Sequence, residues 1–389
     1  MKKIALMILP VILFSCTNDA YKITPKAYQQ ITYLIDTLAE NHVLKELRNI
    51  TEVKLNDDGE LESAVQTNFS YENQEGISEN VEEVYSPDLF WLSSYQSDLS
   101  PIYKKYAEQE LTDTLIIDGK YTFQYNEKSQ LISFTDDGYW NQIHFIYDQH
   151  GQWIQATVHI LEERSGHITY KITKRKIQYN DDPIKSIKQP YLTINGVDIL
   201  KKENRSIADY YVLLKKTEVF IPGNDGGTFD VANGFFEYED EGTGGGNYTG
   251  QLALFKTNDG KDIIAINGFY GDALAYYQTG GSHPKFYLFE NNLFSEIPNI
   301  FPEVNIQMFF DSDYNGSVEE ISSYFSLPKK GLSIQYKIDE GLENFCEKLD
   351  NTNDNYDHNK EICDRYSNVK RTSIDITFDK LTGTFKIKN

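Results

Sequence analysis

The chain has 389 residues, of which 37 are Lys or Arg and 59 are Asp or Glu, so its formal net charge is −22 at pH 7. A surface this acidic repels phosphate backbones, which excludes nucleic acid as an expected partner. The length is sufficient for two or three domains with buried cores. With 28 Tyr and 22 Phe, the composition favours half-buried β-strands.

The first 16 residues form an export signal. Lys2 and Lys3 give a cationic start, residues 4–14 are apolar, and Ser15 precedes Cys16. The apolar run is too short to span a bilayer, which is typical of a cleaved secretion signal. We therefore expect a signal peptide over residues 1–15.

The residues around the cleavage site carry a resemblance. Leu13-Phe14-Ser15-Cys16 resembles the lipobox of bacterial lipoproteins, in which cleavage occurs just before the cysteine. The resemblance implies that Cys16 becomes the acylated first residue of the mature chain and anchors it to a lipid bilayer through palmitate-type chains. Thr17 after the cysteine resembles sorting to the outer membrane, on its periplasmic or surface face. The alternative is an ordinary secretory signal with an accidental cysteine.

Two further cysteines remain, Cys346 and Cys363. In an oxidising compartment an even pair is expected to form a disulfide. Closing a loop of this length stabilises a fold by about 3 kcal/mol in the chain-entropy model. The alternative is a zinc site, which would need Asp or Glu ligands in addition to His358.

Residues 16–50 are expected to form a polar tether and then a helix. Pro25 suits a first helical turn, and the apolar residues that follow recur at helical spacing. They are Tyr28, Ile31, Ile35, Leu38, Leu44 and Leu47.

From residue 51 the pattern changes to short alternating runs separated by turns. It is clearest over residues 115–190, where strand-turn-strand units recur at 121–134, 143–158 and 177–187. Such units stack edge to edge because none can bury its face alone, which predicts an antiparallel β-meander domain over residues 51–190. Within this range, residues 72–83 are polar and are expected to form a loop.

One of these units carries a second resemblance. A strand ends in Tyr147-Asp148, two variable residues and Gly151 follow, and the chain returns at Trp153. This pattern resembles the YD-type repeat and is also similar to lipoproteins common in Bacteroidota. The resemblance implies a β-meander and no catalytic residue.

Residues 191–389 contain short strands between glycine-rich turns, which predicts a C-terminal β domain of the sandwich type. The expected fold class is therefore mainly β: an N-terminal helix, an antiparallel β-meander, and then a C-terminal β-sandwich-like domain. Strands and helices do not alternate, which excludes a doubly wound fold.

One stretch resembles half of a calcium loop. Asp311, Asp313 and Asn315 occupy alternate positions and Gly316 follows them. The twelfth position is Ser322 where a calcium loop places Glu, so a plain hairpin turn is preferred over a metal site.

Other candidate sites are weaker. The glycine-rich stretch 242–250 lacks the Gly-Lys-Ser/Thr ending of a phosphate cradle and is expected to be a loop. His159 and His167 would hold a metal with Glu162 only in one strand register. With 59 acidic residues, choosing two as a glycosidase pair is arbitrary. Aromatic residues such as Trp140 and Trp153 form either core or a sugar-stacking platform.

These observations predict a membrane-anchored exported lipoprotein that acts without catalysis and without a cofactor, binding a glycan or a protein at the cell envelope. One alternative is a glycan-active hydrolase whose paired carboxylates meet only in three dimensions. Another is a structural component of an envelope assembly.

Overall fold

The computed structural model describes most of the chain from residue 24 onward. It covers residues 24–388 except 40–41, 73–75, 84–114, 118–120, 126–130, 137–138, 163–167, 181–183, 185–188, 218–226, 242–246, 272–275, 279–282, 319–320, 340 and 351–355. The predicted signal peptide and the predicted lipidation site, Cys16, lie outside the described residues. The strands of the described residues form three antiparallel sheets, so the predicted mainly β fold is confirmed. Of the helices described, none has the length and apolarity needed to cross a membrane.

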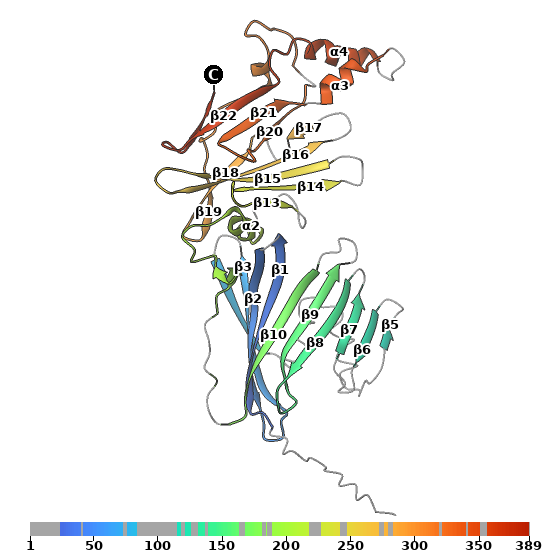
Figure 1. Cartoon of the computed structure of the whole chain (residues 1–389), viewed down its shortest axis with the longest axis vertical. Helices are drawn as coiled ribbons and strands as arrows, with labels where there is room; N and C mark the ends of the chain where they lie inside the picture. The colour runs from blue at the N-terminus through green and yellow to red at the C-terminus, as the bar shows by residue number, and fades with distance from the viewer. Residues whose placement is uncertain are drawn as a thin grey trace, which may run out of the picture.

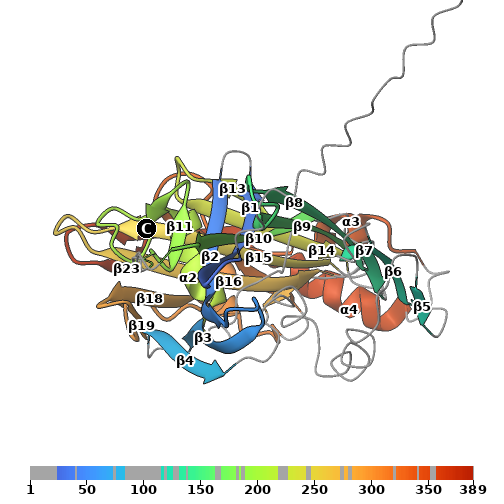
Figure 2. The same ribbon diagram turned by 90° about the horizontal axis from the view of Figure 1, so that it is seen from below.

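The first sheet, which we call sheet A, contains the N-terminal half of the described chain. Its order is β12-β11-β2-β1-β10-β9-β8-β7-β6-β5, and β3 pairs with both β2 and β4. Figure 2 shows that the sheet bends into an arch that runs from β4 through β1 to β5. Its strands are β1 (Ala27–Ala39), β2 (His42–Leu55), β3 (Leu61–Glu72), β4 (Gly76–Glu83), β5 (Leu115–Ile117), β6 (Tyr121–Tyr125), β7 (Leu131–Asp136), β8 (Tyr139–Tyr147), β9 (Trp153–Glu162), β10 (Ile168–Gln178), β11 (Leu192–Ile194) and β12 (Val197–Asp198).

The predicted meander is present. From β5 to β10 each strand pairs antiparallel with the next one along the chain. The last of these, β10, also pairs with β1, so the N-terminal strands extend the meander into one sheet. The sheet therefore joins residues on both sides of residue 50.

The helix predicted within residues 16–50 is wrong, because that segment forms β1 and β2. The apolar residues looked helical because β1 is buried on both faces: Ile31 and Tyr33 are buried on one face, and Gln30 and Thr32 on the other. A strand buried on both faces loses the alternating pattern that identifies strands in a sequence. Its pairing with β10, more than 100 residues away, is not visible locally.

The loop predicted for residues 72–83 is also wrong over most of its length. Residues Gly76–Glu83 form β4, which pairs with β3 along its whole length. Among the described residues β4 pairs with β3 alone, so it lies at an edge of the sheet. Charged residues are a common way of protecting such an edge from pairing with other chains.

The YD-type turn between β8 and β9 is held by its aspartate. The Asp148 carboxylate accepts hydrogen bonds from the backbone N–H groups of His150 and Gln152, both at 2.9 Å, and the Tyr179 hydroxyl donates to its other oxygen. Gly151 has φ +78°, which favours glycine. Asn56 forms the same arrangement between β2 and β3, with Gly59 at φ +83°.

A single buried helix, α2 (Ile207–Lys215), lies between sheet A and the second sheet, sheet B (Figure 1). Every residue from 207 to 214 is buried, and they pack with residues of both sheets in one hydrophobic cluster. Sheet B has the order β13-β14-β15-β16-β18-β19, and β17 pairs with β16. Its strands are β13 (Thr228–Asp230), β14 (Phe235–Glu241), β15 (Asn247–Lys256), β16 (Asp262–Gly271), β17 (Tyr276–Gln278), β18 (Lys285–Glu290) and β19 (Leu293–Glu296).

Sheet B is covered on both faces. Phe236, Leu252 and Ile264 pack with α2, whereas their neighbours Phe235 and Ala253 pack with the third sheet, sheet C. Sheet C has the order β20-β21-β22-β23, so sheets B and C form the predicted β-sandwich-like domain. Its strands, preceded by the 3₁₀ helix η2 (Ile306–Phe309), are β20 (Ser323–Ser326), β21 (Ser333–Ile338), β22 (Ser373–Asp379) and β23 (Thr384–Ile387).

Two short helices, α3 (Gly341–Glu347) and α4 (Tyr356–Tyr366), lie between β21 and β22. A disulfide joins them, with the sulfur atoms of Cys346 and Cys363 2.06 Å apart. The cross-link supports a segment with little core of its own, since α4 has no buried residue.

Candidate functional site

The two faces of sheet A differ in burial along β10. Lys171 and Thr173 are buried, whereas Lys174 and Lys176 on the opposite face are exposed. We call the face that carries Lys171 the inner face. Beside apolar residues such as Val53, Val158 and Ile160, it carries many buried polar side chains, which are costly to bury unless they have partners.

The strand register arranges these polar residues in rows. Gln30 of β1 lies between Thr51 of β2 and Arg175 of β10; in the next row Thr32 lies between Asn49 and Thr173; in the third Leu34 lies between Glu46 and Lys171. The buried polar residues of this face are Gln30, Thr32, Glu46, Asn49, Thr51, Gln66, Asn141, Lys171 and Thr173.

A β-bulge in β2 explains how Glu46 and Asn49 reach the same face. The pairing with β1 skips Arg48, so residues three apart, which normally point to opposite faces, both point inward. Bulges of this kind re-aim side chains and are frequent beside functional sites.

Most of the polar side chains in the first two rows satisfy one another. The Thr32 and Thr173 hydroxyls are 3.0 Å apart, and Thr51 donates to Gln66 at 3.1 Å. Arg175 donates from Nε to Gln30 at 3.1 Å, and its guanidinium lies 3.3 Å from the centre of the Trp153 ring. These side chains therefore form connected polar and aromatic contacts, in which the polar groups are hydrogen-bonded to one another.

Two asparagines depart from this pattern. Asn49 Oδ1, on β2, has no hydrogen-bond partner, and neither Oδ1 nor Nδ2 of Asn141, on β8, has one. Both side chains are at least 95% buried, at 5% and 1% exposed. A buried polar atom without a partner costs about 1–3 kcal/mol, so each of these amides calls for an explanation.

Lys171 lies between the two asparagines in the strand order, on β10. It is only 4% exposed. Burial, and secondly the positive charge of Arg48, lower the pKa of the Lys171 ammonium to about 7. Groups with strongly perturbed pKa values in a polar site are candidates for function.

Glu46 connects the inner face to α2. Its carboxylate accepts hydrogen bonds from Lys216 at 2.6 Å and from the Tyr191 hydroxyl at 3.4 Å, and it forms an ion pair with Arg48 at 3.4 Å. Burial, and secondly the Glu46 charge, raise the pKa of Tyr191. Lys216 follows the last turn of α2, so this cluster fixes the helix to sheet A.

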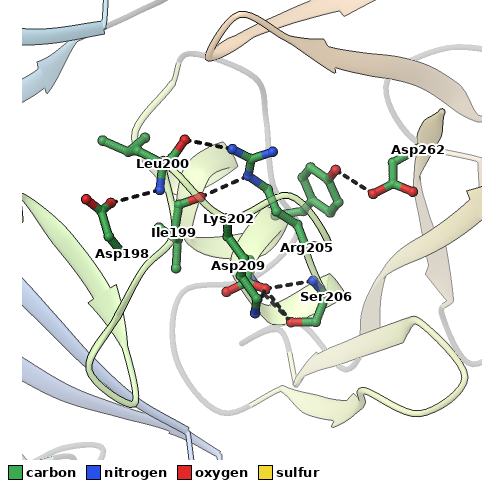
Figure 3. A network of polar contacts seen from close by, with 9 residues as sticks. Asp198, Ile199, Leu200, Lys202, Arg205, Ser206, Asp209 and Asp262 are labelled. Atoms are coloured by element: carbon green, nitrogen blue, oxygen red, sulfur yellow. Dashed lines mark hydrogen bonds and ion pairs between the residues drawn. The ribbon is translucent and has the colours of Figure 1, made fainter. Parts of the chain in front are cut away.

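The start of α2 is held by a second polar network, shown in Figure 3. The Asp209 carboxylate accepts hydrogen bonds from the backbone N–H and hydroxyl of Ser206, at 2.7 and 2.8 Å, and from Lys202 at 2.6 Å. Arg205 donates to the carbonyls of Ile199 and Leu200. This is a capping box, and its role is to hold the connection between sheets A and B.

The calcium candidate occupies a loop between η2 and β20. Asp311 forms an ion pair with Lys370 at 3.4 Å, and its carbonyl accepts a hydrogen bond from the Tyr314 N–H. Tyr314 stacks on Phe310 and covers Gly316. Asp313 and Asn315 lie in the same loop, and no group of three or more His, Cys, Asp or Glu side chains among the described residues is placed to hold a metal.

The histidine candidates lie on the outer face of sheet A. The rings of His159 and His144 are 5.1 Å apart, and His159 also packs against Tyr170. His167 and residues 242–246 of the glycine-rich stretch lie outside the described residues, and β15 begins at Asn247 within that stretch. Trp153 is buried under Arg175.

No family model matches the chain, and no curated protein matches it. Among solved structures, the chain is similar to MucB in the crystal structure of its complex with MucA(peri), with 10% identity over 82% of this chain and 83% of that chain. The TM-score of 0.18 is too low to indicate a shared fold.

Proposed function

We propose that the protein is a lipid-anchored exported lipoprotein that binds a glycan, without catalysis, on the inner face of sheet A. The observation that carries the proposal is a pair of buried asparagines: Asn49, whose Oδ1 lacks a partner, and Asn141, whose Oδ1 and Nδ2 both lack one. Leaving these buried atoms without hydrogen bonds lowers the stability of the free protein. A ligand that supplies the missing hydrogen bonds would remove this cost.

The chemistry of the face favours a ligand rich in hydroxyl groups. A hydroxyl both donates and accepts, so it can satisfy both atoms of the Asn141 amide. The same face offers further hydroxyl and amide groups and the Arg175–Trp153 stack. A purely apolar ligand would leave the amides unpaired.

The spacing favours an oligomer over a single sugar. Asn49 on β2 and Asn141 on β8 are separated by four strand intervals. At roughly 4.8 Å per interval, this places the two strands about 19 Å apart across the sheet. Because both amides are buried, a ligand reaches them only when the atoms that cover them move aside, which makes association slower than diffusion.

Replacing Asn141 by leucine is expected to weaken glycan binding while raising stability. The variant removes two unpaired buried polar atoms, so the free energy of unfolding should rise by about 1 kcal/mol or more, and the loss of ligand hydrogen bonds should weaken binding about tenfold. Calorimetry of the mature protein against a panel of envelope and dietary oligosaccharides measures both the binding and the heat of any hydrolysis. Gln142→Leu, the neighbouring position on the outer face, is the matched control.

Binding that is lost in Asn141→Leu but kept in Gln142→Leu would support the proposal. A panel in which no oligosaccharide binds would overturn it. Cleavage of an oligosaccharide by the purified protein would instead favour the hydrolase.

The anchor is a separate part of the proposal, supported by the resemblance of residues 13–16 to a lipobox and of the turn at 147–151 to the YD-type repeat, which is similar to lipoproteins common in Bacteroidota. Mass spectrometry of the protein from membranes of a bacterium that processes lipoproteins should find Cys16 as an acylated first residue. The Cys16→Ser variant should lose the acyl mass and leave the membrane fraction. An unacylated, released mature chain in the wild type would exclude the anchor.

A further inference from the structure

We propose that His144 and His159 bind a zinc ion on the outer face of sheet A. The site lies on the face opposite to the proposed glycan site, so each proposal can fail without the other. It rests on the spacing and exposure of two neighbouring imidazoles, and imidazole is the commonest metal-binding side chain in proteins.

The strand register places the two histidines side by side. Figure 1 shows β8, β9 and β10 as consecutive strands of the sheet. His159 of β9 lies opposite Gln142 of β8, and His144 is two residues further along β8, so the two imidazoles are diagonal neighbours on one face. On the other side of β9, Tyr170 lies opposite His159. Its ring centre is 4.8 Å from that of His159, so it limits how this imidazole can turn.

The distance between the imidazoles matches that of two ligands on one zinc ion. At a Zn–N distance of about 2.0–2.1 Å, the centre of each ring lies about 3.2 Å from the metal. Two rings at the tetrahedral angle of about 109° then have their centres about 5.2 Å apart. The ring centres of His144 and His159 are 5.1 Å apart. His144 is exposed, so its ring can turn a nitrogen towards the ion.

The surroundings leave the imidazoles available to a metal. Among the described residues they make ring contacts and no hydrogen bond. Burial, and secondly the charge of His144, lower the pKa of His159. This favours the neutral imidazole, which is the form that binds metals. The chain as a whole carries a charge of −22, which attracts cations.

The described residues supply two zinc ligands. No group of three or more His, Cys, Asp or Glu side chains in this part of the chain could hold a metal, so water completes the tetrahedral shell. A site with two protein ligands should have about half the binding free energy of a structural site with four. This corresponds to a dissociation constant of roughly 1–200 µM.

The test is calorimetric titration of zinc chloride into the mature chain at about pH 7.5, without a histidine tag. The chain carries Cys16→Ser, because Cys346 and Cys363 form a disulfide and this change removes the third thiol of the sequence. The variants are His144→Gln and His159→Gln. The matched control is His150→Gln, in the turn of the same hairpin, where the ring packs against Tyr179. A thermal melt without zinc checks that each variant is folded.

We expect one zinc ion to bind per chain, with a dissociation constant of roughly 1–200 µM. His144→Gln and His159→Gln should each weaken binding about tenfold or more, because each removes one of two ligands. His150→Gln should leave the affinity unchanged. Magnesium at the same concentrations should not bind, because it prefers oxygen ligands.

The absence of zinc binding up to about 1 mM would overturn the inference, since it would exceed the affinity range expected for two imidazoles. Binding that is unchanged in both His144→Gln and His159→Gln would also overturn it. Because His144 is exposed, its replacement tests the site even if His159→Gln fails to fold. An equal loss in His150→Gln would contradict the inference as well, because it would show that zinc binds elsewhere on the hairpin.

Discussion

Replacing Glu46 by methionine is expected to lower the free energy of unfolding by about 3 kcal/mol, because the change leaves the Lys216 ammonium, whose side chain is 21% exposed, without its partner. Glu46 is 2% exposed, and its carboxylate holds Lys216 at 2.6 Å and Tyr191 at 3.4 Å. The measurement is equilibrium urea unfolding at neutral pH, followed by tryptophan fluorescence.

A second variant tests whether the unpaired Lys216 ammonium causes this loss of stability. If the cost comes from the unpaired Lys216 ammonium, then Glu46→Met combined with Lys216→Met should recover most of the lost stability, since a buried ion pair is often replaced by apolar residues at little cost. A matched control is Lys360→Met, which breaks an exposed pair with Asp364 and should cost less than about 1 kcal/mol.

A double variant no more stable than Glu46→Met alone would contradict this account. It would mean that Glu46 acts through its hydrogen bond to Tyr191 or through packing, and not through the ion pair that joins β2 to α2.

The Lys171→Met variant is expected to remove a pH dependence of stability. The folded pKa of Lys171 is about 7, whereas its ordinary value is 10.5. Between these values the unfolded chain carries a proton that the folded chain lacks, so the stability of the wild type rises with pH. From about pH 7 to about pH 9 this one residue should add roughly 2–3 kcal/mol to the free energy of unfolding.

Below about pH 7 the ammonium is charged in both states, so this contribution no longer changes with pH. Relative to the wild type, Lys171→Met should therefore gain roughly 2–3 kcal/mol of stability as the pH falls from about 9 to about 7. Urea unfolding over this pH range measures it. Lys174→Met, at an exposed position on the same strand, should keep the wild-type slope.

A Lys171→Met protein whose stability depends on pH as steeply as that of the wild type would contradict this prediction, because the slope would then come from another titratable group.

The parts of the structure that were predicted correctly depend on short-range chemistry. Asp148 and Gly151 specify their turn within five residues, because a carboxylate reaches the N–H groups two and four positions on and glycine accepts a positive φ. The meander from β5 to β10 follows from such turns, since each strand pairs with its neighbour in sequence. The pairing of Cys346 with Cys363 needed only their number and the expected compartment.

The parts of the structure that were predicted wrongly or missed depend on contacts between segments far apart in the sequence. The segment 27–39 reads as a helix until β10 pairs with it, because burial on both faces removes the alternation that reveals a strand. The inner face was missed for a related reason. The bulge at Arg48 breaks the alternation in β2, and the residues it brings together, Glu46, Asn49 and Lys171, are polar side chains that a sequence places on the surface. The sequence by itself thus determined the turns, the meander and the cysteine pair. Only the tertiary structure determined which polar side chains are buried together, because their burial depends on strands that meet only after folding.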